Sequence, residues 1–152
     1  MVLAVLVACA VNAASFNWQA ANIYGSDGQT KFTGDVKLYA VIGGVDTLVH
    51  TAEANAGAVT KTATTFENSS LEAGTGYNFY FVIEEGGKTF TSDTKTLVAQ
   101  ATATVTVNFG NMATATQDSS NWVGGGGDVP EPTSGLLLLV GGALLALRRK
   151  QK

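Results

Sequence analysis

The chain has 152 residues and a formal net charge of −3 at pH 7, but its charges are unevenly distributed. Four of the nine basic residues lie in the last five positions, and every acidic residue lies between residues 14 and 132. Residues 14–132 therefore hold five lysines against twelve carboxylates, a net charge of −7, which argues against nucleic acid as a partner. This interior of about 119 residues is long enough for one small domain and a linker.

Residues 1–13 have the pattern of a secretory signal peptide. Residues 2–11 are apolar, and Val11 and Ala13 stand at the −3 and −1 positions of a cut between Ala13 and Ala14. No lysine or arginine precedes the apolar run, so either the α-amino group supplies the positive end or the true start codon lies upstream. A lipoprotein signal is the alternative, with Cys9 as the lipidated residue. Otherwise Cys9 is a small apolar residue of the leader, and the mature chain contains no cysteine.

Residues 14–110 are predicted to form an all-β domain. Segments rich in β-branched and aromatic residues recur along this region and are separated by glycine-containing turns. About seven or eight short strands at this spacing indicate a β-sandwich or a barrel, and no helix is predicted before Gly135. The predicted strands are 16–20, 35–42, 47–51, 59–66, 77–83, 88–92, 95–98 and 102–109.

Residues 71–81, Leu-Glu-Ala-Gly-Thr-Gly-Tyr-Asn-Phe-Tyr-Phe, resemble the corner between strands E and F of fibronectin type III domains. The resemblance implies an immunoglobulin-like β-sandwich in which Tyr77 forms a structural tyrosine corner, its hydroxyl bonded to backbone a few residues upstream. Residues 85–88 would then form the next hairpin turn. Trp18 is the candidate for the core tryptophan of an early strand.

Residues 111–128 are small and polar and are predicted to form a flexible linker rich in glycine, serine and threonine. Trp122 and Val123 could dock back on the sandwich. The glycine run 124–127 does not fit a phosphate-binding loop, because no Lys-Ser or Lys-Thr follows it.

Residues 129–152 contain three parts in a fixed order. Pro130, Glu131 and Pro132 predict an extended acidic strip, because each proline fixes its own φ and biases the preceding residue toward extended geometry. Residues 133–147 are uncharged and leucine-rich, and they predict one transmembrane helix of about 22 Å, short for a hydrocarbon core of about 30 Å. The cations that follow should stay in the cytoplasm as a stop signal: Arg148, Arg149 and Lys150.

The Pro-Glu-Pro triplet, the following Thr-Ser, the leucine-rich helix and the Arg-Arg-Lys end together resemble the PEP-CTERM sorting signal of exported bacterial proteins. The resemblance implies passage through the secretion translocon, cleavage by signal peptidase, transient insertion in the inner membrane and handling by an exosortase-type protease. It also implies exopolysaccharide as a candidate partner. An unprocessed membrane anchor and a buried apolar helix are the alternatives for this tail, although a buried helix would show regularly spaced polar residues.

The sequence predicts no catalytic site, no metal and no cofactor. His50 is the only histidine, so the usual ligand sets for zinc and copper are lacking. Glu84 and Glu85 are neighbours on a predicted strand, so they should point to opposite faces rather than act as an acid–base pair. Two binding hypotheses remain open, a calcium site and a sugar-stacking face. Their candidate residues are Asp27, Asp35 and Asp46 for calcium, and Tyr24, Tyr39 and Tyr80 for sugar.

We therefore expect a non-catalytic exported protein of the cell envelope or extracellular matrix, at the cell surface or released from it. A carbohydrate- or protein-binding, adhesin-like module on the same scaffold is the alternative, and a secreted hydrolase is a remote one. A long threonine-rich edge strand could also pair with a neighbouring copy.

Overall fold

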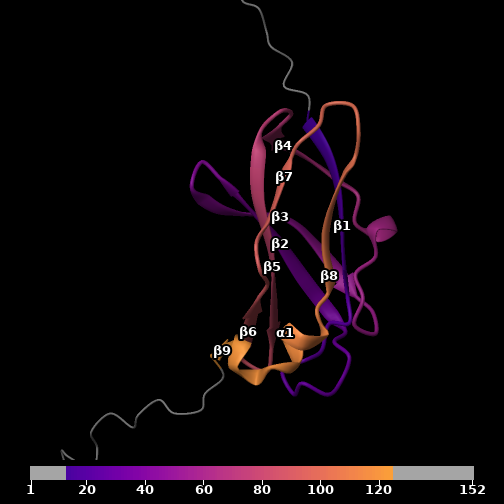
Figure 1. Ribbon diagram of the computed structural model, residues 1–152, viewed down its shortest axis with the longest axis vertical. Helices are drawn as coiled ribbons and strands as arrows, with labels where there is room; N and C mark the ends of the chain where they lie inside the picture. Colours follow the sequence, from indigo (N-terminus) through magenta and orange to yellow (C-terminus); the bar gives the residue numbers. More distant parts are fainter. Residues whose placement is uncertain (1–12, 125–152) are drawn as a thin grey trace, which may run out of the picture.

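The computed structural model describes residues 13–124, which form two β-sheets (Figure 1). The described residues are mostly strand, which confirms the predicted all-β class and is consistent with a sandwich. The elements are β1 (Ala13–Ala21), β2 (Gly34–Ile42), β3 (Val45–Ala54), the 3-10 turn η1 (Lys61–Ala63), β4 (Phe66–Glu72), β5 (Gly76–Glu85), β6 (Lys88–Thr91), β7 (Lys95–Val98), β8 (Val105–Asn111), α1 (Ala113–Gln117), the 3-10 turn η2 (Ser119–Asn121) and β9 (Trp122–Gly124).

The smaller sheet has the order β4-β1-β8, and the larger sheet has the order β3-β2-β5-β6-β9, with β7 also paired to β5. Strands β6 and β7 pair with successive halves of β5, so together they occupy one edge of that strand. The break between them is filled by Ser92, whose hydroxyl accepts a hydrogen bond from the Phe81 backbone N–H at 2.9 Å.

Strand β1 pairs antiparallel with β4 but parallel with β8 (Figure 1). The sheets of immunoglobulin-type sandwiches are antiparallel, so this parallel pair is a departure from that pattern. The immunoglobulin-like assignment therefore stays a prediction.

Tyr77 is the residue predicted to form the tyrosine corner. Its hydroxyl accepts a hydrogen bond from the Glu72 backbone N–H at 2.8 Å and donates to the Ser70 carbonyl at 3.4 Å.

Aromatic side chains from both sheets form the centre of the core. Trp18 of β1 is fully buried, and its ring centroid lies 6.3 Å from that of Phe81 in β5 and 6.2 Å from that of Phe109 in β8. Each buried side chain of this size contributes roughly 1.5–3 kcal/mol or more through burial of apolar surface. The two sheets are thus joined through a contact between residues far apart in the sequence.

The predicted strand 59–66 is wrong. Val59 forms only an isolated bridge with Ala20, residues 61–63 form η1, and β4 begins at Phe66. The Thr64 hydroxyl takes the place of the missing ladder bonds, because it accepts from the Trp18 backbone N–H at 3.0 Å and donates to the Trp18 carbonyl at 2.6 Å. The many threonines of residues 59–66 favoured a strand. The segment does not form one, because the buried Thr64 hydroxyl makes the bonds to β1 that a backbone ladder would make.

Residues 111–124 belong to the folded part, so the structure corrects the linker predicted from residue 111. Met112, Thr116 and Trp122 are buried, and the Trp122 indole N–H donates to the Thr116 carbonyl at 2.9 Å. Helix α1 also corrects the expectation of no helix before Gly135, since a single turn is too short to produce a helical hydrophobic period. These elements cover the lower end of the sheets in Figure 1.

Candidate functional site

Most of the predicted sorting residues lie outside residues 13–124. These are the sorting motif Pro130, Glu131 and Pro132, the basic residues Arg148, Arg149 and Lys150, and nearly all of the predicted leader.

The predicted leader cut falls at the start of β1. Ala13 pairs with Glu72, and Ala14 is fully buried opposite Asn68. A cut between Ala13 and Ala14 would make Ala14 the first residue of the strand. From Ala13 to Gly124, no helix combines the length and the hydropathy needed to cross a bilayer, and the predicted helix 133–147 lies beyond that range.

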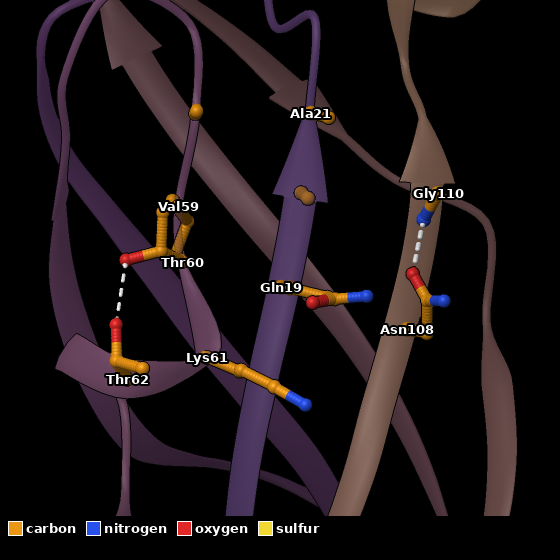
Figure 2. A pocket seen from close by; sticks show the side chains of 10 residues that line it. Gln19, Ala21, Val59, Thr60, Lys61, Thr62, Asn108 and Gly110 are labelled. Atoms are coloured by element: carbon orange, nitrogen blue, oxygen red, sulfur yellow. Dashed lines mark hydrogen bonds between the residues drawn. The ribbon is translucent and has the colours of Figure 1, made fainter.

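A groove of about 420 Å³ lies on the outer face of the smaller sheet (Figure 2). Its base is the end of β1, one wall is the end of β8, and the other wall is the segment 58–62. This segment is held beside β1 by two backbone bonds between Val59 and Ala20, at 2.9 and 3.1 Å. The chain then turns outward into η1, which carries the Lys61 side chain over the groove.

Three polar side chains from different elements meet at this groove: Gln19 of β1, Lys61 of η1 and Asn108 of β8. Gln19 and Asn108 are register partners in the parallel pair, so their side chains share one face of the sheet. The Asn108 Oδ1 atom accepts from the Gly110 backbone N–H at 2.9 Å, so the amide nitrogen is the group that remains to donate (Figure 2).

The polar row of β1 continues beyond the groove to Asn17, two residues before Gln19 on the same face. The Asn17 Oδ1 atom is buried and has no hydrogen-bond partner among residues 13–124. A buried acceptor without a partner costs roughly 1–3 kcal/mol.

Two of the three candidate sugar-stacking tyrosines lie together on the outer face of the larger sheet. Tyr39 and Tyr80 are cross-strand partners with ring centroids 5.4 Å apart and an interplanar angle of 8°. Leu48 of β3, 49% exposed, lies opposite Tyr39. Burial, and then the neighbouring Asp46 carboxylate, raises the pKa of Tyr80.

Tyr24, the third of these tyrosines, lies elsewhere, at a bridge to Lys31. The Lys31 ammonium lies 3.9 Å from the centre of the Tyr24 ring. One face of that ring is therefore already occupied by a cation.

The candidate calcium carboxylates do not converge. Asp27 accepts hydrogen bonds within its own turn, and the Thr30 hydroxyl, followed by the Thr30 and Gln29 backbone N–H groups, lowers its pKa to about 2. Asp35 and Asp46 lie at the starts of β2 and β3. No group of three or more potential metal ligands occurs among the residues that the structure describes.

Glu84 and Glu85 have separate partners. Glu84 forms an ion pair with Lys37 at 2.8 Å, and Glu85 accepts a hydrogen bond from the Ser26 backbone N–H. The two carboxylates are therefore engaged on different sides of the strand, as alternation predicts.

His50 joins the two sheets. Its Nδ1 atom accepts a hydrogen bond from the Trp18 indole N–H at 3.1 Å, and its ring stacks on Phe66 with centroids 5.0 Å apart. An imidazole whose Nδ1 atom accepts a hydrogen bond carries no proton on that atom, so the ring is uncharged. Burial lowers the pKa of His50, in keeping with this role.

We expect a pH-dependent loss of stability that comes from His50. Because its folded pKa is lowered, the unfolded chain binds the proton first, so the free energy of unfolding should fall as pH drops below about 6.5. Urea unfolding at pH 7.5 and 5.5 should show a larger fall in midpoint for the natural chain than for His50→Gln, whose amide oxygen can still accept from Trp18. An equal fall in both chains would contradict this role.

Sequence reasoning missed the groove, because Gln19, Lys61 and Asn108 are far apart in the chain. The alternating polar residues Ser15, Asn17 and Gln19 were the available signal, since they mark the outer face of β1.

Residues 128–150 match the PEP-CTERM protein-sorting motif. The comparisons found no curated protein and no solved structure that matches the chain. The chain is thus a β-rich protein with a PEP-CTERM sorting motif, which implies that it is exported, associated with the cell envelope and processed by an exosortase.

Proposed function

We propose that this chain is a non-catalytic surface module, held briefly in the inner membrane by a single C-terminal helix and released by exosortase cleavage. The observation that carries the proposal is the sorting motif at residues 128–150. The order of its parts supports a cut near residues 130–132, with helix 133–147 in the bilayer and residues 148–150 in the cytoplasm. A helix of about 22 Å suits brief retention better than permanent anchoring.

The extent of the fold supports a short spacer between the domain and the motif. The last described residue, Gly124, pairs with Lys88 at the edge of the larger sheet. Five residues, 125–129, separate it from Pro130, and the six Cα–Cα steps between the two can span at most about 20–22 Å. The folded domain would therefore stand close to the membrane until the chain is cut, with α1 and β9 at the near end.

A structural rather than catalytic role is supported by the partners of the candidate chemical groups. His50 accepts from Trp18, Glu84 pairs with Lys37, and Glu85 accepts from Ser26. Each of these interactions joins different strands or loops, so these groups contribute to the fold. This is the reason to prefer a surface module over a secreted hydrolase.

A binding module on the same scaffold is the second candidate. Two exposed features favour it: the polar groove at Lys61 and the stacked pair Tyr39–Tyr80 beside Leu48. They lie on the outer faces of different sheets, so one surface could bind a ligand while the other stays free.

Export can be tested by protease access to two epitope tags in spheroplasts. One tag replaces the turn Gly43–Gly44, where added atoms meet nothing within 4 Å, and the other follows Lys152. We expect external protease to remove the first tag and to leave the second protected in any unprocessed chain. A matched variant lacking residues 2–11 should keep both tags protected. Protection of both tags in the complete chain would contradict export.

A further inference from the structure

The groove on the smaller sheet combines one cation with neutral hydrogen-bond donors. Its ten lining residues include Lys61 but no carboxylate, although residues 14–132 carry a net charge of −7. The groove is therefore a local positive spot on an acidic domain. A ligand that uses this contrast must carry a negative charge.

The Lys61 ammonium is available to such a ligand. Lys37 is paired with Glu84, and Lys31 donates to Asn22 at 2.8 Å and lies over Tyr24. Within residues 13–124, by contrast, Lys61 Nζ makes no hydrogen bond and no ion pair, and its side chain extends across β1 (Figure 2).

Two amides beside Lys61 add directional donors. The Asn108 oxygen is bonded to Gly110, so its amide nitrogen is left to donate to a ligand. The Gln19 amide lies on the same face and has no partner among the described residues. Amides on neighbouring strands suit neighbouring hydroxyl groups better than a single charged atom, since a hydroxyl both accepts from an amide nitrogen and donates to an amide oxygen.

Methyl groups complete the lining. Ala21 and Ala58 border the same groove and are at least partly exposed, whereas Ala20 and Val59, each 2% exposed, belong to the core beneath it. The groove therefore offers apolar contact beside polar donors. A ring with C–H groups on one face and hydroxyls at its edge matches both kinds of surface.

We propose that this groove binds a carboxylate-bearing sugar residue, a uronate, within an acidic oligosaccharide. Lys61 pairs with the carboxylate, Gln19 and Asn108 hydrogen-bond to neighbouring hydroxyls, and the methyls of Ala21 and Ala58 contact the ring. This assignment rests on the second proposed function, the binding module, and it names the ligand class. It does not depend on export or processing.

The test is calorimetric titration of the full-length chain, in a non-ionic detergent, with a galacturonate tetramer. A neutral galactose tetramer and a tetraglutamate peptide serve as comparison ligands. We expect the galacturonate tetramer to bind more tightly than either, because only it offers both carboxylates and vicinal hydroxyls. Equal binding of the neutral sugar, equal binding of the peptide, or no binding of galacturonate would each overturn the proposal. If the chain is exported normally but does not bind galacturonate, this inference is refuted while the proposed export and processing stand.

Substitutions then locate the site. Lys61→Gln should weaken galacturonate binding about fivefold, the upper range for one exposed charge pair, and Lys61→Arg should retain it. Gln19→Ala should weaken binding about threefold or more through a lost hydrogen bond. Lys95→Gln, which removes the same charge from exposed β7, should change affinity less than twofold. Equal losses for Lys61→Gln and Lys95→Gln would place the binding elsewhere.

Discussion

Trp18→Ala should destabilise the folded domain by about 3–5 kcal/mol, the range for removing a large aromatic side chain from a packed core. Trp18 is fully buried, contacts Phe81 of the larger sheet and Phe109 of its own sheet, and donates to His50. A domain of this size has a free energy of unfolding of about 5–15 kcal/mol, so this single change should remove a large part of it. Chemical unfolding followed by far-ultraviolet circular dichroism measures the loss.

One further variant separates packing from hydrogen bonding at this position, and a variant at an exposed position serves as the control. Trp18→Phe keeps an aromatic ring but loses the indole N–H, so it should cost less than Trp18→Ala while leaving His50 Nδ1 without its donor. Leu48→Ala removes a large apolar side chain that is 49% exposed, and it should change stability by only about 0.5 kcal/mol. A cost for Trp18→Ala no larger than that for Leu48→Ala would contradict the described core.

Replacement of Pro130, Glu131 and Pro132 by alanine should abolish C-terminal processing. The two prolines hold the strip extended for a protease cleft, and Glu131 is its one charge. The variant should therefore accumulate in the membrane fraction with its C-terminus intact. The measurement is the ratio of cleaved to uncleaved chain after pulse labelling, and we expect it to fall at least tenfold.

A matched control keeps the motif and changes its spacer. Substitution of the three glycines 125–127 by serine alters the same number of residues while preserving a flexible composition. Its processing should stay close to that of the natural chain. If the alanine variant is processed as well as this control, the motif does not direct cleavage.

The sequence was sufficient to predict the strands whose side chains alternate clearly. Strand β5 follows from the aromatic alternation of residues 77–83, and β2 from the inward row of Val36, Leu38 and Ala40. Segment 59–66 was misassigned because composition does not reveal that the Thr64 hydroxyl replaces backbone ladder bonds. This replacement of ladder bonds depends on Trp18, 46 positions from Thr64 in the sequence. Local strand propensity does not contain that information.

The fold beyond Gly110 and the groove depend on contacts of the same long-range kind. Residues 111–124 are small and polar, yet Trp122 is buried against Phe90, with ring centroids 5.6 Å apart. The parallel pairing of β1 with β8 brings Gln19 beside Asn108, and η1 adds Lys61. The sorting motif was predictable because all its parts are contiguous in the sequence.

The most direct test of the central claim is the intact mass of the mature protein recovered from the native cell surface or medium. Export followed by exosortase processing predicts a chain that begins at Ala14 and ends between Pro130 and Thr133, with or without an added group. A recovered chain that still ends at Lys152 would contradict processing and would make the tail an ordinary membrane anchor.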